Sequence, residues 1–420
     1  MDKSQRLRGI HYWVPLNFAA RAVNIEFIKL IYLIYESVSI ITCAPWNTNT
    51  TITGGTSMKQ NVLVSGASFA GLSTAYWMSK LGYNVTVVEI AKGLKRGGTP
   101  VNIRGNTVDI VKRMGLLDQI QSNHLKMELT EYKNSNDVTE RTELREDLAD
   151  DEYEIERDVL LNMMFGAVKD DVDFIFGDSI ASLKEESNGV EVAFKGGPKR
   201  SYDLVFGCDG IHSVVRKACF GEEAEFTHFL KTYFSITIVN KLLIKENTTQ
   251  MYNEPGKAIM LNAYNNKTDI VLCFSSDKEI PYDYRNEEQQ RNIILNRFSG
   301  LGWRTPELLE EVENSKTFYF DKLCQVKMPS WTKGRVALVG DAGYCASPAA
   351  GMGGSLAIDG ASALADAFRK CHGDYERAFQ EYNKSFRPFL EEVQTTAEMF
   401  VDFLVPPTEE AIRERHTQEV

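Results

Sequence analysis

The side chains best suited to chemistry in this 420-residue sequence fall mainly in two segments. The first, GASFAG at 66–71, follows an apolar run and opens a stretch with helical character. The second, LVGDAGYCASPAAGMGG at 338–354, has an apolar run that ends in Gly340-Asp341, followed by a loop almost without side chains. A carboxylate beside such a loop can accept hydrogen bonds from hydroxyl groups of a ligand, while the glycines let backbone N–H groups approach it.

The first segment has the pattern of a dinucleotide-binding turn. Gly66 allows the tight turn, Ser68 replaces the usual second glycine with the next-smallest side chain, and Gly71 lets the helix pack close to the sheet. Glu89 ends the next predicted strand, where a carboxylate accepts a hydrogen bond from a ribose hydroxyl. This carboxylate favours the unphosphorylated ribose of FAD or NAD over that of NADP. The alternative is a strand–turn–helix without a ligand.

The second segment favours FAD over NAD, because FAD needs further contacts for its ribitol chain and flavin ring. A carboxylate at a strand end can hold a sugar-alcohol hydroxyl, and the proline fixes the loop. The glycines let a helix N-terminus approach the flavin and stabilise negative charge on the reduced ring. A glycine-rich hinge would not explain the aspartate. The residues predicted to contact ribitol or flavin here are Gly340, Asp341, Pro348, Gly351, Gly353 and Gly354.

The elements around these segments predict an α/β fold. A strand at 61–65, a helix to about residue 81 and a strand ending at Glu89 have the spacing of a right-handed β-α-β unit. Strand-forming pieces near 204 and 336 also end in Gly or Asp, and all three would lie side by side if the β-rich region between them were an insertion. We therefore predict a Rossmann-like FAD-binding domain, an inserted β-rich substrate domain and a C-terminal helix. Further helices are predicted near 157–169, 286–299, 353–371 and 375–404.

The predicted boundaries divide the chain into an extension, two domains and a tail. They are 1–57 for the extension and linker, 58–228 with 327–372 for the FAD-binding domain, 229–326 for the substrate domain, and 373–420 for the C-terminal helix and tail. The apolar stretch at 25–44 contains three charged residues, which disfavours a spanning helix or a signal peptide. We expect residues 1–57 to lie outside the fold, with a membrane anchor as the alternative.

The charge and the cysteine and histidine content of the chain exclude some classes of binding partner. A net charge of −11 argues against a nucleic-acid partner, which would need a basic surface. Seven cysteines are scattered without a C-x-x-C pair, as expected for reduced thiols in the cytoplasm. Six histidines show no metal-binding spacing. We expect a cytoplasmic monomer without a metal.

Three motifs together resemble the class A flavoprotein monooxygenases, the aromatic hydroxylases of the para-hydroxybenzoate hydroxylase type. They are GASFAG with Glu89, CDGIHSVVR at 208–216 and GDAGYCASPAAGMGG at 340–354, in the family's order and spacing. The resemblance covers residues 58 to about 404. Within the family, GGTPVNIRG, EIERDVL and SPAAGMGGSLA are most similar to the tetracycline-inactivating monooxygenases.

The resemblance assigns roles to single residues. Asp341 would bind the ribitol and Arg157 would contact FAD, with a cap or salt bridge as the alternative for Arg157. Asn102 and Arg104 lie where the family's loop touches flavin or ribityl groups. Arg96 lies where such enzymes engage NADPH, and its alternative is an exposed loop residue without a ligand.

A further motif and three departures concern the cofactor contacts. Asp209, with Gly210 and Arg216, matches the motif associated with FAD and NADPH. Asn102 stands where an aspartate is common, Ala-Gly-Tyr follows Gly340-Asp341 where many relatives have Ala-Ala-His, and Gly354 replaces a frequent asparagine. These changes affect details of the flavin contacts.

The resemblance implies an enzyme in which NADPH reduces FAD and a flavin C4a-hydroperoxide transfers oxygen from O₂ to the substrate. No side chain then acts as a nucleophile, because the cofactor carries the chemistry. We expect a small aromatic or polyketide substrate, first a tetracycline and second a simple phenol. A reductase or oxidase without oxygen insertion and a non-catalytic scaffold are the alternatives. Candidate lining residues, each with core packing as its alternative, are Tyr233, Phe234, Tyr264, Phe274, Phe318 and Tyr319.

Overall fold

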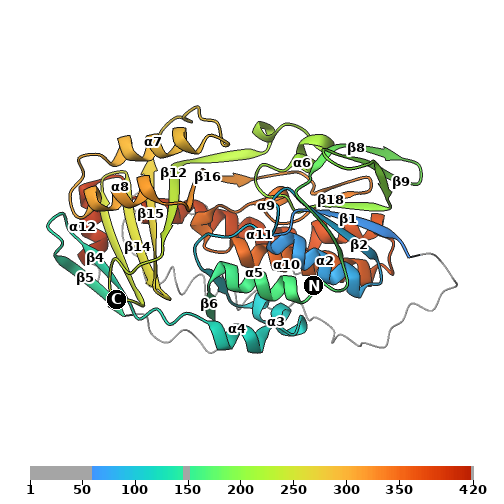
Figure 1. Cartoon of the computed structure of the whole chain (residues 1–420), viewed down its shortest axis with the longest axis horizontal. Helices are drawn as coiled ribbons and strands as arrows, with labels where there is room; N and C mark the ends of the chain where they lie inside the picture. Colours follow the sequence, from blue (N-terminus) through green and yellow to red (C-terminus); the bar gives the residue numbers. More distant parts are fainter. Residues whose placement is uncertain (1–58, 145–151, 418–420) are drawn as a thin grey trace, which may run out of the picture. The chain divides into compact units, whose positions relative to one another are not determined.

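The computed structural model describes residues 59–144 and 152–417 of the chain (Figure 1). The predicted extension and linker at 1–57 lie outside these residues. No helix within the described ranges combines the length and the apolar composition of a membrane span.

A six-stranded sheet has the order β17-β18-β11-β1-β2-β7. Its strands are β1 (Asn61–Ser65), β2 (Asn84–Glu89), β7 (Asp173–Phe176), β11 (Leu204–Gly207), β17 (Thr332–Lys333) and β18 (Val336–Leu338). β1 pairs in parallel with β2 and β11, and β11 pairs in parallel with β18. The three strands predicted near 61, 204 and 336 therefore lie side by side, which confirms the α/β fold.

The apolar runs of the central strands follow from their burial on both faces. Val62, Leu63 and Val64 of β1 are completely buried, as are neighbouring residues of β11. Strands covered on both faces have continuous rather than alternating apolar residues. One face of the sheet packs against α2, and the strands β9 and β10 lie against β11 and β1.

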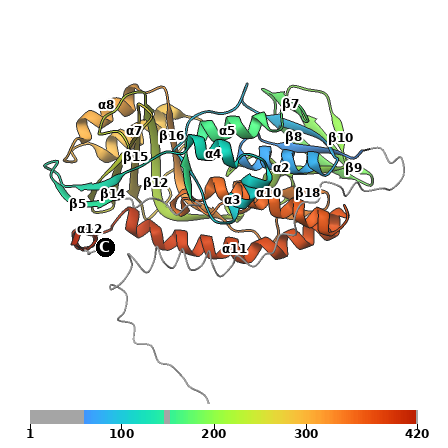
Figure 2. The same cartoon turned by 90° about the horizontal axis from the view of Figure 1, so that it is seen from below.

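Helices and two small sheets complete this part of the molecule. The helices are α2 (Phe69–Lys80), α3 (Asn106–Arg113), α4 (Leu117–Asn123), α5 (Arg157–Gly166), α6 (Val214–Cys219), α9 (Asp341–Tyr344), α10 (Gly353–Lys370) and α11 (Tyr375–Leu404), with 3-10 turns η1 (Glu223–Glu225) and η2 (Pro348–Ala350). The small sheets contain β3 (Val101–Ile103) with β6 (Tyr153–Ile155), and β8 (Ile180–Glu186), β9 (Gly189–Phe194) and β10 (Arg200–Tyr202). α10 packs between α2 and α11, and Figure 2 shows α11 as one continuous helix despite Pro388.

A seven-stranded sheet has the order β16-β12-β15-β14-β13-β4-β5. Its strands are β4 (Leu129–Lys133), β5 (Thr139–Leu144), β12 (Thr227–Val239), β13 (Thr248–Glu254), β14 (Lys257–Tyr264), β15 (Lys267–Ser275) and β16 (Phe318–Val326). α7 (Glu287–Phe298) and α8 (Thr305–Asn314) cover one face (Figure 1), where apolar side chains of both helices join those of the strands in one core. A last helix, α12 (Glu409–Thr417), contacts β13 and β5.

Residues 129–144 correct one predicted boundary. The sequence interpretation placed them in the FAD-binding domain, whereas the structure places β4 and β5 in the seven-stranded sheet. β4 pairs in parallel with β13, with Leu129 opposite Thr248. This pairing joins strands more than a hundred residues apart, so the local alternation of polar and apolar residues predicted the strands but not their partner.

Candidate functional site

Segments far apart in the sequence meet at the carboxyl edge of the six-stranded sheet. Because β1, β2, β11 and β18 run in parallel, the loops that follow them leave from the same edge. The backbone N–H of Ala67 donates to the Glu89 carboxylate at 2.8 Å. The turn at 66–71 also lies against the carbonyl of Cys208 and against Gly340. The structure thus brings the three sequence motifs into contact.

The turn at 66–71 accepts only glycine at its two ends. Gly66 has a φ of 104°, and a Cβ there would overlap the carbonyl oxygen of Cys208. A Cβ on Gly71 would overlap the carbonyl oxygen of Gly66. Ser68 is the N-cap of α2 but makes no capping hydrogen bond with its side chain. The positive end of this twelve-residue helix is therefore open to an anionic ligand such as a pyrophosphate.

Glu89 fixes the end of β2 and retains capacity for a ligand. Its two carboxylate oxygens accept hydrogen bonds from the backbone N–H groups of Ala67, at 2.8 Å, and Ala91, at 2.9 Å. Each oxygen of an ionised carboxylate has a second lone pair. Glu89 can thus hold the turn in place and still accept a hydrogen bond from a ribose hydroxyl.

Arg157 connects two loops next to the α2 N-terminus. Its guanidinium donates to the carbonyl oxygens of Lys95 and Gly97, both at 3.0 Å, and to the Ser68 hydroxyl at 3.2 Å. Asp158 lies 3.7 Å away, so the salt bridge proposed as an alternative role is also present. Burial lowers the pKa of Arg157 and Asp158 opposes this effect. The arginine places a cation beside the open helix N-terminus, where a phosphate would be favoured.

Asn102 and Arg104 lie on or next to β3, which packs against α10. The hydroxyl of Ser355 donates to the Asn102 carbonyl oxygen at 2.6 Å. A Cβ on Gly354 would overlap the side chain of Val101, so the approach of β3 explains why position 354 has no side chain. Arg104 forms an ion pair with Glu152 at 3.7 Å.

Asp341 is the carboxylate of the third motif, GDAGYCASPAAGMGG. It follows Gly340, whose φ of 69° and close approach to Ala70 suit glycine, and it is the first residue of α9. The side chain is accessible to solvent and yet enclosed by surrounding protein. This enclosure raises the pKa of Asp341, and a hydrogen bond with the thiol of Cys345 opposes the rise. An accessible carboxylate with acceptor capacity is what a polyol ligand needs.

The loop after Asp341 leaves open space. Ser347 has a φ of 87°, and its hydroxyl accepts a hydrogen bond from the N–H of Ala349 at 3.3 Å, which shapes the turn at Pro348. Among the described residues, no atom lies within 4 Å of where a Cβ on Gly351 or Gly353 would be. α10 begins at Gly353 and has no side-chain cap, so its first N–H groups face this region unblocked by a cap. Open space, an uncapped helix end and a nearby carboxylate fit the flavin and ribitol of FAD.

Asp209 and Arg216 have protein partners that organise the site. Asp209 accepts hydrogen bonds from the hydroxyls of Ser65, at 3.4 Å, and Ser213, and from the N–H groups of Val214 and Val215. Burial raises its pKa although these bonds oppose the rise. In this structure Asp209 therefore holds the start of α6.

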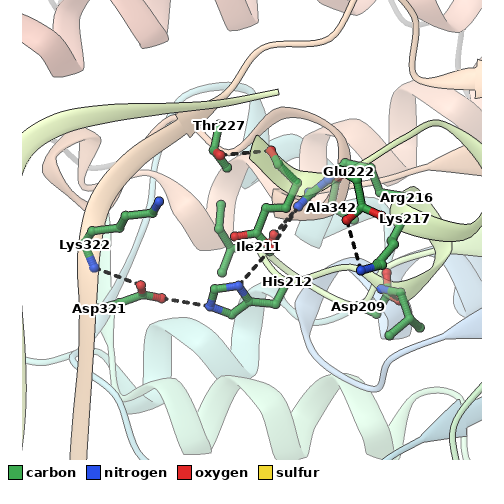
Figure 3. A network of polar contacts seen from close by, with 12 residues as sticks. Asp209, Ile211, His212, Arg216, Lys217, Glu222, Thr227, Asp321, Lys322 and Ala342 are labelled. Atoms are coloured by element: carbon green, nitrogen blue, oxygen red, sulfur yellow. Dashed lines mark hydrogen bonds and ion pairs between the residues drawn. The ribbon is translucent and has the colours of Figure 1, made fainter. Parts of the chain in front are cut away.

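The buried Arg216 side chain links the second and third motifs (Figure 3). Its guanidinium donates to the carbonyl oxygens of Ile211 and, at 2.9 Å, of Ala342, the residue after Asp341. Arg216 thus fixes the backbone next to Asp341, the residue predicted to bind the ribitol.

Arg96 is exposed. With Arg157 it lines a pocket of about 160 Å³ whose other side includes Tyr264 and Lys267 of the seven-stranded sheet. Lys267 is paired with Glu156 at 2.7 Å. The pocket is too small for a whole nicotinamide dinucleotide but presents a cation at its edge.

Sequence reasoning missed a buried carboxylate and a histidine beside this site. Asp321 lies on β16 and His212 lies in the CDGIHSVVR segment, with 3.5 Å between their nearest side-chain atoms. The available signal was the alternation in β16, which puts Tyr319 and Asp321 on one face. Of the six aromatic lining candidates, Tyr319 has the most accessible side chain, at 40%, while Tyr233 and Phe274 belong to the core under α7 and α8.

Comparisons with known proteins agree with this geometry. The model of the family described as "FAD binding domain" matches residues 59–395. An uncharacterised protein of Mycobacterium tuberculosis is 37% identical over 341 residues, which are 80% of this chain and 92% of the relative. A flavin-dependent monooxygenase of Legionella longbeachae is 34% identical over 334 residues, 79% of this chain and 86% of the relative.

Solved structures of other proteins also match this chain over most of its length. The tetracycline destructase Tet(51) superposes with a TM-score of 0.77 at 35% identity, covering 86% of this chain and 95% of that protein. The tetracycline destructase Tet(55) gives 0.76 at 32% identity, covering 85% and 94%. These matches confirm the predicted FAD cofactor and the resemblance to class A enzymes. The chain belongs to the FAD-binding family that contains these proteins, and it is a flavin-dependent monooxygenase.

Proposed function

We propose that this monooxygenase uses NADPH as reductant and inserts one oxygen atom of O₂ into an aromatic or polyketide substrate, with tetracyclines as the first class to test. The observation that carries the cofactor part is the accessible Asp341 carboxylate beside the open space at Gly351 and Gly353. The substrate class is supported by the relatives at 35% and 32% identity that are named tetracycline destructases.

Each part of FAD has candidate partners in the chain. Glu89 would accept a hydrogen bond from the adenosine ribose, and the α2 N-terminus with Arg157 would hold the pyrophosphate. Asp341 would bind the ribitol, and the uncapped start of α10 would face the flavin. FAD, when bound, supplies hydride acceptance and the activation of O₂.

The protein's own contribution is orientation, charge stabilisation and the exclusion of water. The positive end of α10 would stabilise negative charge on a reduced flavin. The face of β16 that presents Tyr319 would form the wall opposite Asp341. Excluding water from this space would keep activated oxygen from escaping as peroxide.

NADPH is proposed as a transient partner. The first motif is the only dinucleotide turn we found in the sequence, and Glu89 there suits an unphosphorylated ribose. Arg96, exposed at the edge of the pocket beside Arg157, would attract the phosphates of NADPH at the surface. A compartment with reduced thiols, such as the cytoplasm, would suit the six described cysteines, none of which forms a disulfide.

The test is NADPH consumption by the purified yellow protein against a panel of tetracyclines and phenols, with the mass of each product. Substrate-dependent consumption together with a product that has gained one oxygen atom would support the proposal. NADPH consumption that is independent of every substrate and gives only peroxide would support an oxidase instead. NADH in place of NADPH provides the comparison for the reductant.

A further inference from the structure

A polar cluster next to the candidate flavin site centres on the buried Asp321 (Figure 3). The Asp321 carboxylate accepts hydrogen bonds from the hydroxyls of Tyr282, at 2.8 Å, and Tyr319, at 2.9 Å, and from the N–H of Lys322, at 2.8 Å. The Nε2 atom of His212 lies 3.5 Å from the same carboxylate. Two segments of the seven-stranded part and the CDGIHSVVR segment thus converge on one side chain.

His212 supplies this cluster with a positive charge. Its Nδ1 atom lies 2.9 Å from the carboxylate of Glu223, and its ring stacks on Tyr284 with 4.6 Å between ring centroids. Burial lowers the pKa of His212, but hydrogen bonds with Asp321 and Glu223 outweigh it and raise the pKa to about 9. Burial alone would raise the pKa of Asp321, yet the contact with His212 brings it below its usual value. At neutral pH the pair is an imidazolium beside a carboxylate.

Tyr319 extends the cluster toward the loop that follows Asp341: its ring centroid lies 5.6 Å from that of Phe234, which shares an apolar cluster with Ala349 of that loop. Its neighbour Phe320 points into the core and is 4% exposed, whereas Tyr319 is 40% exposed. The Lys95 ammonium lies 5.7 Å from the Tyr319 ring centroid. Although Tyr319 is accessible, surrounding protein encloses its phenol and raises its pKa, and the negative charges of Asp321 and Asp341 add to this rise. Tyr319 is therefore accessible to solvent and lies close to the apolar cluster that includes the loop after Asp341.

The hydroxyl proton of Tyr319 forms the hydrogen bond to Asp321. An ionised carboxylate can only accept hydrogen bonds, so the phenol must be the donor in this contact. The phenol oxygen then offers its lone pairs, and no proton, to any ligand at the accessible face. The raised pKa of Tyr319 and the lowered pKa of Asp321 both oppose passage of a proton from a ligand to Asp321. The arrangement suits orientation of a ligand rather than proton transfer.

We propose that Tyr319 determines which substrates are oriented at the flavin, because its phenol oxygen accepts a hydrogen bond from a phenol or enol hydroxyl of the substrate. Asp321 and His212 are positioning residues that hold this acceptor in place. The inference rests on the proposed function only in assuming that a hydroxylated aromatic or polyketide compound reaches the flavin.

The test compares ligands that differ in one donor. Oxidised holoenzyme is titrated with phenol, with anisole, which has no hydroxyl proton, and with tetracycline, while the flavin absorbance is followed. Wild type should bind phenol about three- to tenfold more tightly than anisole, the factor that one neutral hydrogen bond contributes. Y319F should bind both equally and bind tetracycline more weakly, with its flavin content unchanged.

Two further variants separate orientation from general structure. Y375F removes a hydroxyl at the start of α11 and should retain the phenol preference of wild type. D321N keeps Tyr319 but replaces the anion that orients it, so the preference should fall although the phenol remains. Wild type without a preference for phenol, or Y319F with the same preference as wild type, would overturn the proposal. These binding results do not depend on turnover, so they are separable from the NADPH and product-mass assays of the proposed function.

Discussion

The Asp341 carboxylate combines solvent access with enclosure by protein, a state that favours a hydroxylated ligand over bulk water. Cys345 is its side-chain hydrogen-bond partner among the described residues, so most of its acceptor capacity is free for a polyol. Arg157 differs, because its guanidinium already bridges two loops and its loss would also disturb them. Replacing Asp341 therefore tests cofactor binding more specifically than replacing Arg157.

Replacing Asp341 by alanine should weaken FAD binding by about 10- to 100-fold, the loss of a hydrogen bond to a charged group. The measurement is flavin retained after purification and the Kd for FAD added back to apoprotein. D277A, which removes an exposed carboxylate outside the site, is the matched control. Flavin content equal to wild type in D341A would contradict the assignment.

At the scale of elements, two neighbouring glycines at the start of α10 serve different purposes. Gly354 lies against Val101 of β3, whereas a Cβ on Gly353 would enter open space. G354A should destabilise the apoprotein by about 1 to 3 kcal/mol through overpacking, and V101A should partly restore its stability. G353A should leave the unfolding free energy of the apoprotein nearly unchanged but reduce FAD affinity. Denaturant unfolding and FAD titration distinguish these effects, and equal behaviour of the two variants would exclude the explanation.

The contact between the CDGIHSVVR segment and β16 should make stability depend on pH. The pKa of His212 is about 9 in the folded protein and about 6.5 when unfolded. Because the folded value is higher, the stabilisation is complete below about pH 6.5 and is lost as the pH rises through about 9. The expected loss is about 3 kcal/mol. Urea unfolding of wild type and H212Q between these values should show a decline that is smaller in H212Q, and parallel curves would refute this role.

At the scale of the whole molecule, FAD should stabilise the fold because it would contact three distant segments at once. At a free FAD concentration 100 times the Kd, the expected gain in unfolding free energy is about 2.7 kcal/mol. Thermal unfolding of apoprotein with increasing FAD measures this gain, and D341A should need correspondingly more FAD for the same shift. A midpoint that does not change with FAD would count against a single site built from these segments.

The sequence predicted those elements in which an apolar run is followed directly by residues that can bind a ligand. The β-α-β unit and the strands ending at Gly207 and Leu338 could be predicted because each is a short apolar run followed by small or acidic residues. α12 was not predicted, because its mostly polar sequence owes its place to contacts such as that of Arg415 with Asn253. Asp321 was missed for a related reason, since a single aspartate in a strand gives no sign that a histidine more than a hundred residues earlier will lie beside it.

The parallel pairing of β4 with β13 has a practical consequence for protein engineering. The chain leaves the nucleotide-binding part at residue 129, supplies two strands to the other sheet, and reaches β6 again at Tyr153. Any contiguous fragment that contains the complete seven-stranded sheet therefore also carries β7 and β11 of the six-stranded sheet. A chimera that transfers substrate preference between relatives would have to exchange 129–144 and 409–417 together with 227–326, or leave β13 with an unpaired edge.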